Sequence, residues 1–331
     1  MAWADSARHA HAPSTGGVSD WNRSHSPYFP LFAPDSTWNL RIPDNAAIDP
    51  HQDAYLDKLW WAMRDYGTLS INRERWTVPI WYADHTTLTH RVECTAGWGC
   101  GPGFGDHVPI PNEAIPDPED DGHMVVVDLE RGLAWEFWQA WQDESGWHAG
   151  YGIVFNISES PYTDHPLGVV QPVGHQSDPW ATSARASGVS LLGGLIRYSE
   201  LSAGRIDHAL AFAYPLTRGD AYAPIATHND NNHSASRTEH DNLPLGARLR
   251  LRRSVDVASR CGENSACVTI GRALQEYGMY LVDTAGRPVL YAEGLYGKDL
   301  SWDGLLDSHD VGTFDAWDFE VLEIPGLIPT P

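Results

Sequence analysis

Residues 121–138 read DGHMVVVDLERGLAWEFW, and they carry the clearest structural signal in the chain. An apolar run at 124–128 is followed by a polar segment with Gly132 and then by a second apolar run at 134–138. Two short runs rich in valine and aromatic residues, with a glycine-containing segment between them, are typical of a β-hairpin. The stretch therefore predicts two antiparallel strands that turn near residues 129–132.

The second strand of this hairpin carries a candidate catalytic group. Glu136 and Trp138 are two positions apart, so both side chains project from one face of the strand. An exposed indole ring can stack on a sugar while a nearby carboxylic acid transfers a proton. If the pairing register sets Trp138 opposite His123, three functional side chains share one surface, and Trp141 adds a further sugar-binding ring. Ordinary cross-strand packing beside a solvated Glu136 explains the same pattern equally well.

The two-residue alternation recurs along most of the chain and indicates further strands. They are expected at 76–82, 88–92, 152–156, 209–214, 248–252, 279–283 and 289–293, the last two as a hairpin. Apolar residues spaced by three and four predict a helix over 53–66 that ends at Gly67. A second helix is expected over about 268–277, and residues 191–200 fit either a short helix or a turn-rich crossover.

The order of these elements indicates the fold class. Helices do not alternate regularly with strands, so a parallel doubly wound sheet is not expected. We expect a mainly β fold, built as a two-sheet antiparallel sandwich of the jelly-roll kind with a few short helices. The aperiodic segment 1–21 predicts a flexible N-terminal tail. Without an internal repeat or a clean linker, residues 22–331 are expected to form a single domain.

Charge narrows the classes of partner. The 331 residues include 22 basic and 44 acidic side chains, which give a formal net charge of -22. This charge repels phosphate backbones and anionic lipid surfaces, so neither nucleic acid nor membrane is expected as a partner. The acidity also fits a protein that simply stays soluble in saline surroundings, as a monomer or a small homo-oligomer.

The four cysteines fall into two local pairs of equal spacing, Cys94 with Cys100 and Cys261 with Cys267. Neither pair has the C-x2-C spacing by which a tight turn aims two thiolates at one metal ion. Two disulfides that close short loops fit better, and they imply an oxidising compartment, so we expect a secreted or periplasmic protein. Four free buried thiols are the alternative.

One segment resembles known sequences. The pattern Gly194-Leu-Ile-Arg197, Glu200, Gly204 and His208-Ala-Leu, with the later Leu245-Gly-Ala-Arg-Leu-Arg-Leu251, is similar to segments of secreted bacterial proteins of unassigned activity. The resemblance covers only part of the chain and implies no mechanism. His208 precedes an apolar strand, so it is a candidate catalytic residue at a strand end, with Glu200 as a substrate-binding candidate. A structural histidine bonded to nearby backbone is the alternative.

Histidines and arginines suggest two further kinds of site. The polar segment 227–241 contains three histidines, and a divalent metal ion is a candidate cofactor with His123, His208 and His228 as its ligands, although such a segment is normally only a loop. Arg250 lies on an arginine-rich strand and could orient an anionic group of a substrate, or pair internally with the many acidic residues. Several tryptophans also lie among polar residues: Trp98, Trp147, Trp180 and Trp302.

These patterns together predict a secreted carbohydrate-active enzyme that cleaves glycosidic bonds of a polysaccharide or oligosaccharide. Glu136 would be the general acid or base, with His123 or His208 as its partner. Hydrolysis is favoured, and a polyuronate lyase competes if arginines face the cleft. A lectin-like module that binds glycan without chemistry is the main alternative, and a structural or adhesive surface protein is a third.

Overall fold

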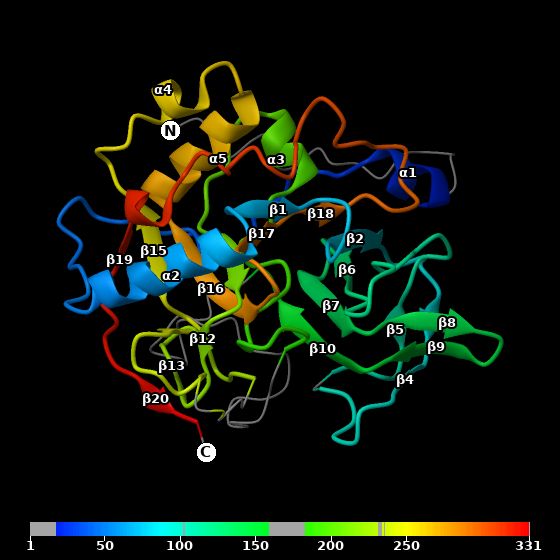
Figure 1. Cartoon of the computed structure of the whole chain (residues 1–331). Helices are drawn as coiled ribbons and strands as arrows, with labels where there is room; N and C mark the ends of the chain where they lie inside the picture. Colours follow the sequence, from blue (N-terminus) through cyan, green and yellow to red (C-terminus); the bar gives the residue numbers. More distant parts are fainter. Residues whose placement is uncertain (1–17, 102, 159–182, 231–233, 235, 331) are drawn as a thin grey trace.

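The computed structural model describes residues 18–101, 103–158, 183–230, 234 and 236–330. With 27% strand and 16% helix, the fold is mainly β, as the sequence predicts. Two larger sheets dominate it (Figure 1). The six-stranded sheet has the order β1 (Ser70–Asn72), β17 (Val289–Tyr291), β11 (Leu210–Tyr214), β16 (Met279–Thr284), β15 (Arg248–Leu251) and β19 (Phe319–Val321). The five-stranded sheet has the order β10 (Tyr151–Asn156), β7 (Leu133–Trp138), β6 (Met124–Asp128), β2 (Val78–Ala83) and β18 (Glu293–Gly294).

Smaller elements surround the two sheets. The short strands are β3 (Thr89–His90) with β5 (Val108–Pro109), β4 (Val92–Cys94) with β9 (Gly146–Ala149) and β8 (Trp141–Asp143), β12 (Thr217–Arg218) with β14 (Leu243–Pro244), and β13 (Ala221–Tyr222) with β20 (Ile328–Pro329). The helices are α1 (Val18–Ser24), α2 (Gln52–Tyr66), α3 (Tyr198–Ser202), α4 (Val257–Cys261), α5 (Ser265–Glu276) and the 3-10 turn η2 (Ala316–Asp318). In Figure 1, α2 and α5 lie beside the six-stranded sheet, and β4, β5, β8 and β9 lie beside the five-stranded one.

A buried core joins the facing sides of the two larger sheets. Ala211, Val282 and Tyr291 of the six-stranded sheet belong to one apolar cluster with Val125 and Ile153 of the five-stranded sheet. These residues follow the two-residue period of a strand, so alternate positions point away from this core. The alternate positions of the six-stranded sheet pack against α2 and α5, and those of the five-stranded sheet pack against the small strands.

Strand direction departs from the expected sandwich. The jelly-roll sandwich is not confirmed, because four pairings in the larger sheets are parallel: β1 with β17, β11 with β16, β18 with β2, and β2 with β6. Parallel neighbours need a long crossover connection, and the chain between β11 and β16 supplies one that includes α4 and α5. The hairpin expected over 279–293 is wrong, since β11 lies between its two strands and Ala213 pairs with both Asp283 and Val289.

The two larger sheets meet along one continuous stretch of chain. Strand β17 ends at Tyr291 in one sheet, and β18 begins at Glu293 in the other. Between them Ala292 donates to the Asn72 carbonyl oxygen at 3.0 Å and accepts from the Val78 amide at 3.4 Å. The backbone therefore passes from one sheet directly into the next.

The N-terminal segment is more ordered than expected. Residues 18–21, assigned to the flexible tail from the sequence, belong to helix α1, while residues 1–17 lie outside the described part of the chain. Asn22 is fully buried in the same helix, and its side chain donates to the Tyr82 carbonyl oxygen at 3.0 Å and to Glu113 at 2.9 Å. These bonds attach the helix to strand β2, so the chain is anchored at Asn22, directly after the segment predicted as a tail.

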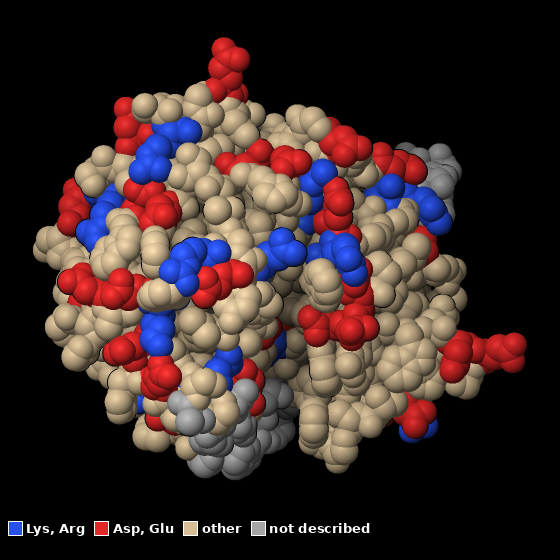
Figure 2. Space-filling model, viewed as in Figure 1, with Lys and Arg blue, Asp and Glu red and all other residues tan. Residues whose placement is uncertain are grey.

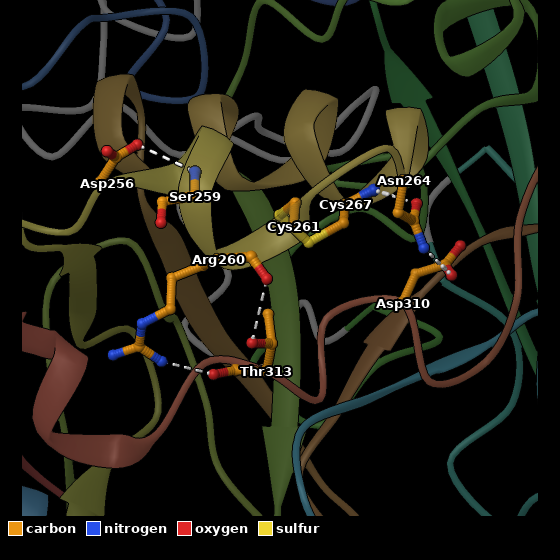
Figure 3. The surroundings of a disulfide bond; sticks show 8 residues. All are labelled: Asp256, Ser259, Arg260, Cys261, Asn264, Cys267, Asp310 and Thr313. Atoms are coloured by element: carbon orange, nitrogen blue, oxygen red, sulfur yellow. Dashed lines mark hydrogen bonds between the residues drawn. A yellow bond between two sulfur atoms is a disulfide. The ribbon is translucent and has the colours of Figure 1, made fainter.

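Both predicted disulfides are present. Cys94 bonds Cys100 and Cys261 bonds Cys267, with Cα–Cα distances of 5.3 and 5.5 Å. Figure 3 shows the second bond joining α4 to the first turn of α5, where the Asn264 side chain accepts a hydrogen bond from the Cys267 amide at 2.9 Å. Disulfides of this kind form in oxidising surroundings, which supports an extracellular location. Among the residues that the structure describes, none of the helices is both long and apolar enough to span a bilayer.

Candidate functional site

A cleft with a volume of about 1390 Å³ opens where the ends of the two larger sheets face each other. Figure 2 shows the surface hollowed between the two sides of the molecule, in the region where Figure 1 places β10 and β16. Both sheets contribute to its lining, with His123, Trp138 and Tyr151 from one and Asp283 and Tyr291 from the other. The cleft is therefore an extension of the space between the sheets, at the point where apolar core residues give way to polar ones.

The five-stranded sheet brings three of these side chains together. Met124 pairs with Phe137, so His123, the residue before Met124, lies opposite Trp138. Trp138 in turn pairs with Tyr151 on β10. The register that the sequence left open therefore sets His123, Trp138 and Tyr151 side by side on the face that points toward the other sheet.

A β-bulge aims Asp283 into the cleft. Phe212 pairs with Leu281, but the next residue, Ala213, pairs with Asp283, which leaves Val282 as an extra residue in β16. An extra residue shifts the alternation of the side chains that follow it. Asp283 consequently shares the face of Ala213, which looks toward the five-stranded sheet, instead of the face covered by helices.

The segment after residue 183 adds a positive charge. The buried guanidinium of Arg185 lies 5.0 Å from the centre of the Tyr291 ring. It donates to the Gly193 carbonyl oxygen at 3.1 Å and to that of Leu191 at 3.2 Å. Because these acceptors are neutral carbonyls, the positive charge of Arg185 remains available to the carboxyl groups of the cleft.

Mutual electrostatic effects show that the polar groups of the cleft lie close together. Burial and the negative charge of Asp121 raise the pKa of Asp283 to about 7, against the opposing effect of Arg185. Burial and the charge of Asp283 also raise the pKa of Tyr291. Asp283 is therefore a carboxyl group that keeps its proton up to neutral pH, the property of a general acid.

His123 supplies a candidate base beside them. Its Nε2 atom lies 3.1 Å from the Ala184 carbonyl oxygen, a partner that can only accept, so Nε2 carries the proton and Nδ1 the lone pair. No residue in the described ranges bonds Nδ1. Burial lowers the pKa of His123, although the nearby charge of Asp121 opposes this. The imidazole is therefore neutral at pH 7 and can accept a proton through Nδ1.

Glu136, predicted as the catalytic acid or base, does not line the cleft. Its side chain is fully buried, where it accepts hydrogen bonds from the Ser190 hydroxyl and from the Leu191 amide, the latter at 2.9 Å. Burial raises its pKa to about 7, and these hydrogen bonds oppose the shift. Glu136 thus anchors the segment whose carbonyl groups hold Arg185, and it has no open side facing a substrate.

His208 and Glu200 also lie outside the cleft, in a buried ionic cluster. His208 Nε2 lies 3.1 Å from Glu200, and the Arg197 guanidinium lies 2.5 Å from the same carboxylate. Burial opposes the ionisation of Glu200, yet the charges of His208 and Arg197 lower its pKa to about 2. The segment that resembles secreted bacterial proteins therefore forms an internal salt bridge here, and His123, Glu136 and His208 do not converge.

Arg250 and Trp141 have other surroundings too. Arg250 is buried, donates to Glu320 at 2.6 Å and to the Pro43 carbonyl oxygen at 2.9 Å, and so follows the alternative of internal pairing. Trp141 is exposed on a small sheet, stacked on the His148 ring at 4.9 Å, outside the cleft.

The predicted metal ligands are not grouped. His123 and His228 line the cleft, but His208 does not. Within the described ranges, no three His, Cys, Asp or Glu side chains are arranged to hold a metal ion. Among the tryptophans noted in polar surroundings, Trp98 is exposed at the cleft, Trp147 and Trp302 are buried, and Trp180 lies outside the described residues.

Sequence reasoning missed Asp283, Asp121, Arg185 and Tyr291 as site residues. One signal was present, because Asp283 ends an apolar strand and strand ends often carry functional side chains. No protein-family model, curated protein or solved structure matches this chain. The geometry of the cleft is therefore the basis on which a function can be argued.

Proposed function

We propose that the protein is a secreted enzyme that hydrolyses glycosidic bonds of a polysaccharide or oligosaccharide in this cleft. The supporting observation is the grouping of Asp283 with Asp121 and His123, next to the aromatic rings of Trp138 and Tyr151. Glycoside hydrolysis needs one carboxylic acid that holds its proton at working pH and a second carboxyl group that handles water or the sugar. The partly exposed indole ring of Trp138 provides a face on which a pyranose can stack.

Each group then has a definite task. Asp283 donates its proton to the glycosidic oxygen as the bond to the anomeric carbon breaks, and becomes a carboxylate. Asp121 either removes a proton from an attacking water molecule or attacks the anomeric carbon itself, the two cases giving inversion or retention of configuration. Neutral His123 accepts a hydrogen bond from water or a sugar hydroxyl through Nδ1. Arg185 offsets the negative charge that Asp283 acquires.

The substitution Asp283→Asn tests the proposal. We expect kcat/KM on a susceptible glycan to fall by about 10²–10⁴-fold, the usual contribution of a general acid. In the unsubstituted protein, activity should decline as the pH rises past about 7, because Asp283 then loses the proton it must donate. The matched control is Asp44→Asn, an exposed aspartate paired with Arg253 outside the cleft, which should keep full activity.

Other results would assign the cleft differently. Reaction on a panel of neutral and acidic polysaccharides should be followed by reducing ends and by ultraviolet absorbance. Unsaturated products that absorb in the ultraviolet, formed from polyuronates, would show that the reaction is elimination and not hydrolysis. Glycan binding that persists in Asp283→Asn, with no turnover by the unsubstituted protein, would make it a lectin-like module.

A further inference from the structure

Aromatic side chains extend along one end of the five-stranded sheet. Neighbouring strands β10, β7 and β6 carry Tyr151, Trp138 and His123 at this end, with about 4.8 Å between adjacent strands. Beyond β6, Trp76 precedes the start of β2. Beyond Tyr151, Trp98 lies in the loop closed by the Cys94–Cys100 disulfide. The order of strands therefore sets an indole on each side of the central catalytic group, and both indoles line the cleft.

Trp76 is held in a costly conformation. Its φ angle of 51° lies in the left-handed region that residues with a side chain rarely adopt, and such strain is often kept where it presents a functional group. The guanidinium of Arg75 lies 4.5 Å from the centre of its ring, and Arg75 is itself fixed by two hydrogen bonds to Glu119, at 2.5 and 2.8 Å. Despite this support the side chain is 39% exposed, and it lines the cleft.

Trp98 is the most exposed large apolar side chain among the described residues, at 71%. The disulfide closes its loop, and two backbone hydrogen bonds attach the loop to β10 and its preceding residue: Ala96 donates to Gly150 at 3.0 Å and Gly101 to Gly152 at 2.7 Å. The backbone that carries this exposed indole is therefore restrained before any ligand arrives. Preorganised aromatic groups lose little conformational freedom on binding.

We infer that the cleft binds a linear, uncharged glycan across the end of the five-stranded sheet, with Trp76 and Trp98 as stacking platforms on opposite sides of the catalytic groups. The lining mixes four acidic side chains with four arginines, so it offers no uniformly basic surface to an anionic polymer: Glu74, Asp121, Asp230, Asp283, Arg73, Arg75, Arg185 and Arg287. A formal net charge of -22 also repels polyanions at longer range. The inference rests on the proposed function for the reaction, but its chain-length dependence concerns binding alone.

Calorimetric titration of the Asp283→Asn protein measures this binding without turnover. The probes are the hexamers and dimers of β-1,4-linked glucose, xylose and mannose, with hexagalacturonate as the charged comparison. We expect at least one neutral hexamer to bind ten times more tightly than its dimer and than hexagalacturonate. Adding Trp76→Ala or Trp98→Ala should lower hexamer affinity about tenfold and leave dimer affinity within about twofold. Phenylalanine at either position should restore most of the loss.

Trp61→Ala is the matched control. Trp61 is 44% exposed with the Arg64 guanidinium 3.6 Å from its ring centre, so it resembles Trp76 but lies on α2 outside the cleft. Its loss should leave hexamer affinity unchanged. The inference is overturned if no neutral hexamer binds or if hexamer and dimer bind equally. It is also overturned if Trp76→Ala and Trp98→Ala act no differently from Trp61→Ala. Hydrolysis of short glycans without chain-length preference would overturn this inference but keep the proposed function. Hexamer binding without turnover by the unsubstituted protein would keep the inference but overturn the proposed function.

Discussion

Glu136 is a carboxyl group without access to water, held by the Ser190 hydroxyl and the Leu191 amide. Burial disfavours its charged form, so its pKa is raised from 4.5 to about 7. A carboxyl group with a raised pKa favours the folded state fully below its unfolded pKa, and this contribution is lost as the pH rises through the folded pKa. Glu136 therefore destabilises the fold progressively between about pH 4.5 and pH 7.

Replacement of this group predicts a change in the pH profile of stability. Glu136→Gln cannot ionise: its amide oxygen can accept from the Leu191 amide in place of Oε2, while its NH2 group, in place of Oε1, can donate to the Ser190 hydroxyl oxygen. At pH 8 we expect the variant to exceed the unsubstituted protein in free energy of unfolding by about 3 kcal/mol, and at pH 4 to match it or fall slightly below. Urea unfolding at both pH values measures the difference. Equal slopes of stability against pH in the two proteins would contradict the assignment.

The residue pattern alone could not show that Glu136 is covered whereas Trp138 is open to the cleft. Their spacing correctly predicts a shared face, because alternation within a strand is local. The segment that covers Glu136 and leaves Trp138 open comes from residues 183–195, far along the chain. Likewise Asp283 reaches the cleft only because of a bulge at Val282, which depends on pairing with a distant strand. Contacts of this range leave no periodic signal in a sequence.

Helices α4 and α5 depend on a small covalent loop. The Cys261–Cys267 disulfide joins them across a sequence separation of 6, and Asn264 caps α5 inside that loop while bonding Asp310 at 2.6 Å. Closing so short a loop limits the unfolded chain and stabilises the fold by about 2 kcal/mol.

Removal of the Cys261–Cys267 disulfide tests this predicted stabilisation. Replacing both Cys261 and Cys267 by serine should lower the free energy of unfolding by about 2 kcal/mol, as measured by urea unfolding, without changing glycan affinity. Opening the Cys94–Cys100 loop in the same way serves as comparison. It should cost similar stability but also weaken hexamer binding, because that loop carries Trp98. Identical behaviour of the two double variants would argue against separate roles.

Helices and strands could be predicted where their sequence pattern is local. The strands with which each strand pairs could not be predicted in this way. The apolar period of three and four predicts a helix over 53–66, and α2 spans Gln52–Tyr66. Strands β6 and β7 appear as the hairpin that residues 121–138 predict. The placement of β11 between β16 and β17 has no such local cause, because it requires the chain to return from outside the sheet. The local pattern therefore could not reveal the parallel pairing of β11 with β16, and the expected antiparallel sandwich is not confirmed.

The molecule as a whole carries a large excess of negative charge, with 44 acidic against 22 basic side chains. Self-repulsion of like charges destabilises the compact state, and salt screens it over about 10 Å at 0.1 M. Buried pairs such as Glu293 with Lys298, 3.1 Å apart, are screened much less than surface charges. Salt should therefore act mainly on the surface charges of the molecule.

Salt dependence of the melting temperature checks this expectation. At pH 8, raising NaCl from about 0.05 M to about 1 M should raise Tm by roughly 2 °C or more, which is about 1 kcal/mol in a protein of this size. The control is the same series near pH 4.9, the isoelectric point of the sequence, where little net charge remains to be screened. A Tm that falls with salt at pH 8, or an equal rise at both pH values, would refute the argument.

The stretch from β17 through Ala292 into β18 has a mechanical consequence for the cleft. The backbone hydrogen bonds of Ala292 with Asn72 and Val78 join its two walls there, so separating the walls along this margin requires these bonds to break. The width of the cleft along that margin is therefore set when the protein folds. If the proposed function holds, a linear glycan fits such a cleft better than a branched one.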